Sequence, residues 1–225
     1  MEKKDNKIIT IIFIIVIVLI IIFFILNFLN IKKTNNSYEI LQKYKPNRNE
    51  IIEIVRNKLP VVMLGVVEDW FIYDKNDLID QRKLTEEVLN ENTKLLNNVL
   101  TINKRYEINL VQDKNNLKNS KLIRENKVRH FLCLLTGNIS VYLFNPEQKI
   151  EYIINNNGQQ ESKYSFWTKE KEHLKETKYM EINLGTEQIL FIPYGWWYCY
   201  QVKDTSIMLD INSDTVFTLP IKKLL

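Results

Sequence analysis

The residues from Ile8 to Leu29 form an almost unbroken apolar run, in which only Thr10 and Asn27 are polar. A helix of these 22 residues is roughly 33 Å long, enough to cross a hydrocarbon core of roughly 30 Å. A helix in the core of a soluble protein does not need an apolar surface on every side, so this run is not typical of such a helix. A cleaved signal peptide has a shorter apolar stretch that ends in small residues, and this chain contains no Ala for the usual cleavage site. The run therefore predicts an uncleaved transmembrane helix over 8–29, after a short polar N-terminus over 1–7.

The lysines that flank this run leave its orientation open. Three of them, Lys3, Lys4 and Lys7, precede the run, and Lys32 and Lys33 follow it, so the positive-inside rule favours neither side. The chain is thus expected to be a single-pass membrane protein whose first partner is the lipid bilayer.

The composition of the rest excludes several classes of protein. A hydrophobic content of 45% excludes a disordered chain, and two cysteines exclude a disulfide scaffold. After removal of residues 1–33 there remain 26 basic and 25 acidic residues, so no basic field argues for a nucleic-acid partner.

The 31 Ile and 26 Asn, with no Ala, indicate an AT-rich genome such as that of a parasite, a protist or a large DNA virus. In the viral case the membrane is a host or virion membrane.

The first half of the remaining chain predicts few regular elements. Residues 30–48 are polar and predict a tether, and the folded domain is expected over 49–225. A helix is expected from Glu50 to Leu59 with Asn49 as its cap, followed by a buried strand from Val61 to Val67. Apolar spacing favours a further helix over 82–100, and residues 112–127 are typical of a loop.

From residue 128 onward the pattern is that of short strands. Apolar runs over 131–136 and 139–144 flank Gly137-Asn138, which predicts a hairpin. Further strands are expected over 152–154, 180–184, 188–192, 197–202, 206–211 and 216–219, and a solvated helix or loop over 169–178. This spacing predicts a mostly β fold, a sandwich or barrel with a few flanking helices.

Three segments in order resemble the cupin-like JmjC-type oxygenases. They are LPVVMLGVVEDWF from Leu59, RHFLCLLTGNISVYLFNP from Arg129 and ILFIPYGWWYCYQV from Ile189. Together they extend over about residues 50–218. The resemblance implies a double-stranded β-helix, or jelly roll, in a family that uses Fe(II) and 2-oxoglutarate.

The residues that this family uses for its chemistry are replaced. The family's spacing from Gly137 places the first two iron ligands at Arg124 and Asn126, the third at Tyr198, and the lysine that pairs with 2-oxoglutarate at Ile139. A guanidinium keeps its proton and an amide offers only a neutral oxygen, so the iron triad of two His and one carboxylate is missing. The four positions are therefore expected to form a vestigial pocket without metal or cofactor.

Few residues are available as replacements. The two histidines are His130, expected to be structural at the start of a strand, and His173, expected at the surface. Glu125 would face away from the barrel if Arg124 faced inward, although a shift of one residue would reverse this. Cys133 and Cys199 lie in apolar strands and are expected to be small core residues.

Three functions follow as hypotheses. The leading one is a non-catalytic, metal-free binding or scaffolding module held at a membrane. The second is an active Fe(II)/2-oxoglutarate protein hydroxylase with displaced ligands, which requires a histidine beside a carboxylate in the barrel mouth. The third is a jelly roll that binds a carbohydrate or peptide through the aromatic residues Trp196, Trp197, Tyr198 and Tyr200.

Overall fold

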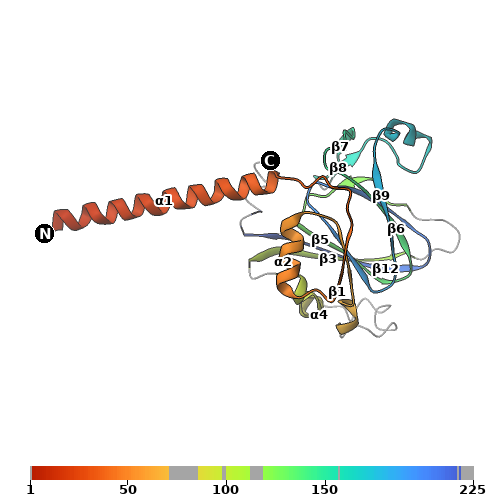
Figure 1. Ribbon diagram of the computed structural model, residues 1–225, viewed down its shortest axis with the longest axis horizontal. Helices are drawn as coiled ribbons and strands as arrows, with labels where there is room; N and C mark the ends of the chain where they lie inside the picture. Colours follow the sequence, from red (N-terminus) through yellow and green to blue (C-terminus); the bar gives the residue numbers. More distant parts are fainter. Residues whose placement is uncertain are drawn as a thin grey trace. The chain divides into compact units, whose positions relative to one another are not determined.

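The computed structural model describes residues 2–70, 86–97, 100–111, 119–156, 158–216 and 218 (Figure 1). The chain divides into two compact units. The first consists of Met1–Lys33 and Thr215–Leu225, and the second, called the body below, is Thr34–Asp214.

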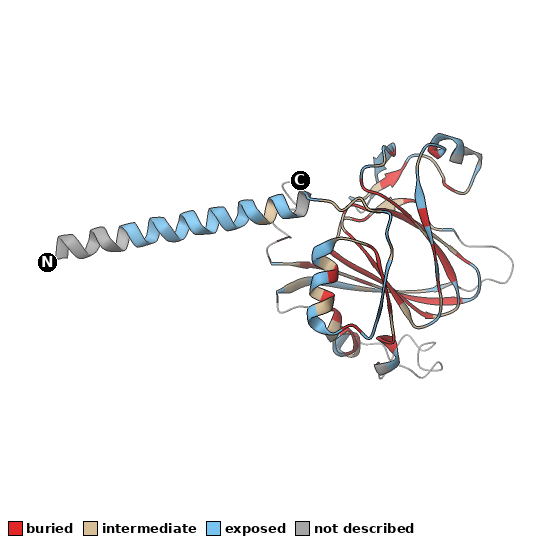
Figure 2. Cartoon of the chain, viewed as in Figure 1, coloured by how far each residue is buried: buried red, intermediate tan, exposed pale blue. Residues whose placement is uncertain are grey.

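The N-terminal helix α1 spans Glu2–Lys32. Its apolar segment Ile11–Asn30 has a mean hydropathy of 3.6, and none of it is buried in the protein (Figure 2). The amide of Asn27 donates to Phe23 O at 2.8 Å, so this polar side chain is satisfied within the helix itself. By length and composition α1 is able to cross a membrane, a test that an N-terminal signal sequence also passes.

The body is mostly β, as predicted. Its strands are β1 Leu41–Tyr44, β2 Val61–Leu64, β3 Thr101–Val111, β4 Ile123–Arg124, β5 Arg129–Thr136, β6 Ile139–Phe144, β7 Tyr152–Ile154, β8 Gln160–Ser162, β9 Tyr179–Leu184, β10 Gln188–Ile192, β11 Trp197–Val202 and β12 Ser206–Thr215. The helices are α2 Arg48–Asn57 and α4 Glu86–Asn92, with 3-10 turns η1 Val67–Asp69, η3 Thr93–Leu96 and η4 Lys169–Leu174.

The strands form two six-stranded sheets with the connectivity of a jelly roll. The first sheet has the order β1-β2-β10-β5-β12-β3, and the second has the order β7-β8-β4-β11-β6-β9. From β3 to β6 and again from β9 to β12 the chain changes sheet at every strand, which confirms the predicted double-stranded β-helix.

Alternating side chains along each strand build three apolar layers. On β5, Leu132 and Leu134 point between the sheets and meet Val141 and Leu143 of β6. Phe131 and Cys133 point the other way and pack beneath α2 and η3. A third cluster lies on the far side of the second sheet, where Phe144, Trp197 and Cys199 pack against Phe166 and Leu174. Strands β5, β6 and β10 are therefore largely buried on both faces, which explains their continuous apolar runs (Figure 2).

The hairpin predicted at Gly137-Asn138 is wrong, although both flanking strands are present. Because β5 already has β10 and β12 as its neighbours, β6 pairs instead with β11 and β9 in the other sheet. The two residues form a corner between sheets. Gly137 has φ +93°, and a Cβ built there would lie 2.1 Å from Ser206 Oγ, so only glycine fits.

Helix α2 begins earlier than predicted, because its cap is Asn47 and not Asn49. Asn47 Oδ1 accepts from the backbone N–H of Asn49 and Glu50, and Glu50 Oε2 accepts from Asn47 N at 2.8 Å. This reciprocal capping box uses the three-residue spacing of Asn47 and Glu50. The helix ends at Lys58, whose backbone is left-handed with φ 53°.

The segment predicted as a tether, 30–48, belongs in large part to the body. Strand β1 runs parallel to β2, with Leu41 opposite Val61, and the amide of Asn35 donates to Asn57 O at 3.1 Å. All four residues of β1 are exposed and form no apolar run, so the side chains gave no strand signal, while the backbone completes the sheet edge.

Other predicted boundaries shift by a few residues. Strand β2 ends at Leu64, before Gly65 with φ +73°. The predicted helix over 82–100 is α4 followed by η3, and its residues 82–85 and 98–99 lie outside the described part. Strand β4 interrupts the loop expected over 112–127, of which 112–118 lie outside the description. Val216 is a turn residue, so the strand expected over 216–219 is not supported where it is described.

Candidate functional site

A cavity of about 480 Å³ opens between the two sheets of the body. Strands β3 and β12 form one wall through Glu107, Asn109 and Asp210, and β11 forms the other through Tyr198 and Tyr200. The segment from Ser120 to Lys127 closes it, and Asn155, Gln159 and Glu161 complete the rim. Most of these side chains carry amide, hydroxyl or charged groups, so the cavity is a polar site in an otherwise apolar barrel.

Three charged side chains meet behind the cavity wall. His130 Nδ1 lies 2.6 Å from Glu125 Oε2, and His130 Nε2 lies 2.9 Å from Asp210 Oδ1. The His130 side chain is 1% exposed and that of Glu125 is 2% exposed. Both nitrogens of the imidazole therefore face a carboxylate, and the histidine itself does not reach the cavity.

The charge of His130 follows from these two neighbours. Burial alone would lower the pKa of His130, but the carboxylates of Glu125 and Asp210 outweigh it and raise the pKa to about 10. The imidazole is thus protonated at neutral pH, and both of its nitrogens are donors. One positive charge is balanced against two negative charges, which leaves this cluster with a net charge of −1.

The backbone around Glu125 explains why its side chain turns inward. Glu125 N donates to Trp196 O at 2.8 Å, and Gly195 N donates to Glu125 O at 2.9 Å. These bonds join the end of β4 to the turn before β11. Gly195 has φ +86°, a conformation that this turn needs and that side chains rarely adopt.

The two tyrosines of the cavity keep their phenolic protons. Burial, reinforced by the nearby carboxylates of Glu125 and Asp210, raises the pKa of Tyr198 well above its usual value. Burial and the carboxylates of Asp210 and Glu107 raise the pKa of Tyr200 to about 12. Both hydroxyl groups are therefore available as hydrogen-bond donors at neutral pH.

The expected vestigial pocket is only partly formed. Tyr198 and Asn126 line the cavity, but Arg124 points to the opposite side of the second sheet. There its Nε donates to Gly195 O at 3.0 Å, and its guanidinium lies 5.9 Å from the Trp197 ring. Ile139 is 1% exposed and packs in the apolar layer between the sheets. On β4 the inward residue is thus Ile123, one residue before the expected Arg124, and after the strand both Glu125 and Asn126 line the cavity.

Of the aromatic residues expected to face a ligand, only Tyr198 and Tyr200 line the cavity. Trp196 is fully buried between the sheets, and Trp197 is 2% exposed in the layer on the other side of the second sheet. They pack in the core because strand alternation and the turn at Gly195 direct them away from the cavity.

Other candidates lie where they were expected. His173 is exposed and its ring stacks on Tyr164 with 4.1 Å between centroids, away from the cavity. Cys133 and Cys199 are buried in apolar layers, and burial raises the pKa of the Cys133 thiol. A thiol in this environment is a poor nucleophile.

The residues present do not fit an Fe(II)/2-oxoglutarate centre. Within the described ranges, no three His, Cys, Asp or Glu side chains are placed to hold one metal ion. Glu125 and Asp210 contact opposite nitrogens of the same ring, so one metal ion cannot be bound by His130 and both carboxylates. Ile123 and Tyr198 face inward opposite one another. Their side chains provide neither the imidazole nor the carboxylate that an iron triad needs.

Three residues of the cavity wall were not predicted from the sequence: Asp210, Glu107 and Asn109. A signal for Asp210 was present, because it is the one charged residue in the apolar stretch from Ile207 to Ile211. A buried strand that carries a single carboxylate indicates a partner across the barrel. Glu107 and Asn109 lie on β3, whose alternating polar residues are equally typical of a solvent-facing strand.

No protein-family model matches the sequence, and no curated protein is significantly similar to it. Among solved structures, the chain is similar to a dTDP sugar isomerase from Desulfovibrio desulfuricans G20, with 16% identity and a TM-score of 0.32 over 49% of this chain and 57% of that one. It is also similar to the hydroquinone 1,2-dioxygenase from Sphingomonas sp. TTNP3 with 4-hydroxybenzoate bound, with 14% identity and a TM-score of 0.33 over 55% and 65%. The aligned part is less than two thirds of either chain.

Proposed function

We propose that this protein is a membrane-anchored binding module that uses the jelly-roll fold without a catalytic metal. The observation that carries the proposal is the ion cluster of Glu125, His130 and Asp210. The buried histidine holds two carboxylates in place and has no nitrogen left for a metal ion. The apolar segment Ile11–Asn30 of α1 supports the anchor, because none of it is buried in the protein.

The alternative of a hydroxylase with displaced ligands requires a histidine beside a carboxylate in the barrel mouth. His130 lies 2.6 and 2.9 Å from two carboxylates, but it is buried behind the cavity wall, and the same contacts argue against the alternative. To bind iron, His130 would have to lose its proton and one carboxylate contact. Removing one partner from a buried ion pair costs about 3–5 kcal/mol.

The test is a metal and cosubstrate assay on the full-length protein in detergent. Purified protein is incubated anaerobically with Fe(II), desalted, and analysed for bound iron. 2-Oxoglutarate is then added in a calorimetric titration and in a succinate assay. We expect less than stoichiometric iron, no heat of binding and no succinate. Iron retained at one equivalent together with succinate formation would show that the protein is an oxygenase.

A further inference from the structure

We infer that the cavity of the body binds a neutral, polyhydroxylated ligand, such as a sugar ring, through Asn126, Tyr198 and Tyr200. This inference rests on the proposed function and names the chemical class of the ligand. Three properties of the cavity wall support it: its paired charges, its unused hydrogen-bonding groups and its aromatic rings.

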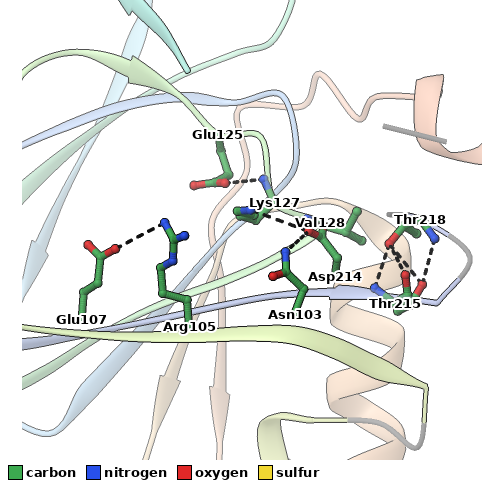
Figure 3. A network of polar contacts seen from close by, with 9 residues as sticks. All are labelled: Asn103, Arg105, Glu107, Glu125, Lys127, Val128, Asp214, Thr215 and Thr218. Carbon is green, nitrogen blue, oxygen red and sulfur yellow. Dashed lines mark hydrogen bonds and ion pairs between the residues drawn. The ribbon is translucent and has the colours of Figure 1, made fainter. Parts of the chain in front are cut away.

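The charges of the cavity wall are already paired within the protein. Arg105 Nη1 lies 3.8 Å from Glu107 Oε1, Lys121 Nζ lies 2.6 Å from Glu161 Oε1, and Lys127 Nζ lies 3.7 Å from Asp214 Oδ2. Figure 3 shows the first and third of these pairs, with Asn103 and the backbone of Val128 also directed at Asp214. Each basic side chain of the wall therefore has an acidic neighbour within 4 Å.

A charged ligand would fit this wall poorly. An anion would approach Glu125 and Asp210, whose two negative charges exceed the single positive charge on His130. A cation would meet the net charge of −1 on that cluster, but the carboxylates there are already engaged by His130, and the desolvation cost of a buried ion can exceed the Coulombic gain. An anion would leave water without any unpaired partner of opposite charge, which disfavours binding.

Several hydrogen-bonding groups of the wall lack a partner inside the described part of the protein. Asn126 Oδ1 is buried and accepts no hydrogen bond from the described residues. The hydroxyl groups of Tyr198 and Tyr200 line the cavity, and no contact with another described side chain engages them. A buried polar group without a partner costs free energy, and a ligand that supplies the bond recovers it.

A ligand that satisfies these groups must both donate and accept. Asn126 Oδ1 requires a donor, whereas the protonated tyrosines offer donors. Hydroxyl groups perform both roles without carrying charge. Tyr198 and Tyr200 also bring aromatic surface to the cavity lining, which suits the C–H groups of a sugar. A volume of about 480 Å³ is within the usual range for small-molecule sites.

The experiment is saturation-transfer NMR on the full-length protein in a detergent without a sugar headgroup, because a maltoside would compete. The probes are glucose, galactose, mannose and N-acetylglucosamine. Glucose 6-phosphate and glucosamine serve as anionic and cationic counterparts of the same ring. We expect at least one neutral sugar to bind, with its charged counterparts about tenfold weaker.

Three variants locate the binding site. Tyr198→Phe and Asn126→Ala each remove one hydrogen-bonding group from the cavity, and each is expected to weaken sugar binding by about tenfold. Tyr44→Phe makes the same change at a tyrosine that is 70% exposed on β1 and is expected to leave binding unchanged. Thermal melts verify that all three variants fold.

Three results would overturn the inference: no neutral sugar binds, a charged counterpart binds as well as its neutral one, or both folded cavity variants bind like the wild type. None of these results bears on the absence of iron, which the metal assay tests separately. Failure of the ligand class is therefore distinguishable from failure of the proposed function.

Discussion

Tyr198 of β11 and Ile123 of β4 are direct neighbours across the second sheet, and both line the cavity. Glu125 follows two residues after Ile123 and also faces inward. An imidazole at each of the first two positions, together with this carboxylate, would provide two His and one acid from adjacent strands. That is the ligand set of a facial iron triad.

We therefore predict that Ile123→His with Tyr198→His creates a metal site in this barrel. The expected result is about one equivalent of Fe(II) or Zn²⁺ bound in anaerobic metal analysis, where we expect the wild type to retain less than stoichiometric metal. The matched control is Arg124→His with Tyr198→His, which adds the same two histidines but places one on the opposite side of the sheet. Equal metal binding by both pairs would contradict the orientation of β4.

Stability should depend on pH through His130. Its pKa is raised from 6.5 in the unfolded chain to about 10 in the folded protein, so the folded state holds the proton more tightly. This contribution to stability is complete below pH 6.5, declines as pH rises above that value, and is lost as pH passes through about 10. Thermal melts of the full-length protein from pH 6 to pH 10 measure this decline.

The matched variant for this prediction is His130→Gln, which keeps a polar side chain but cannot carry the charge. It leaves Glu125 and Asp210 close together without a cation between them. We expect a loss of about 3–5 kcal/mol at pH 7 and a shallower decline in stability between pH 6.5 and pH 10. If the decline in stability between pH 6.5 and pH 10 were the same in the variant as in the wild type, it would have to come from another titrating group.

Gly137→Ala should destabilise the body because of the corner between β5 and β6. The new methyl group would meet Ser206 Oγ at 2.1 Å and Thr205 O at 2.7 Å, and the backbone there has φ +93°. We expect a loss of more than about 3 kcal/mol, from backbone strain of roughly 1–3 kcal/mol and the added clash.

Gly158→Ala is the matched control for this change. Gly158 has φ +72°, but no atom lies within 4 Å of its added methyl group, so only the strain of roughly 1–3 kcal/mol remains. Denaturant unfolding of both variants measures the difference. Equal losses would show that the corner at Gly137 tolerates a side chain.

The regular elements of the body were largely predictable, because their signals are local. The apolar runs of β5, β6, β10 and β11 are visible in the sequence, and so is the apolar surface of α1. Strand β1 was missed for the opposite reason: its four side chains show no apolar run and are all exposed, and only backbone pairing with β2 makes it a strand. Of the four positions expected from the resemblance, Tyr198 and Asn126 line the cavity, and Arg124 and Ile139 do not.

By itself, the sequence determined the apolar N-terminal helix and the mostly β class of the body, because both depend on residue identity and near-neighbour spacing. The tertiary structure decided which sheet each strand joins, and so made Gly137 a corner and not a hairpin turn. It also decided which side of β4 faces inward, placing Glu125 beside His130 and turning Arg124 away. Asp210 completes that cluster from 80 residues further along the chain, a contact that only the pairing of β5 with β12 creates. Local patterns carry no information about such pairings, because they depend on which strands compete for the same edge.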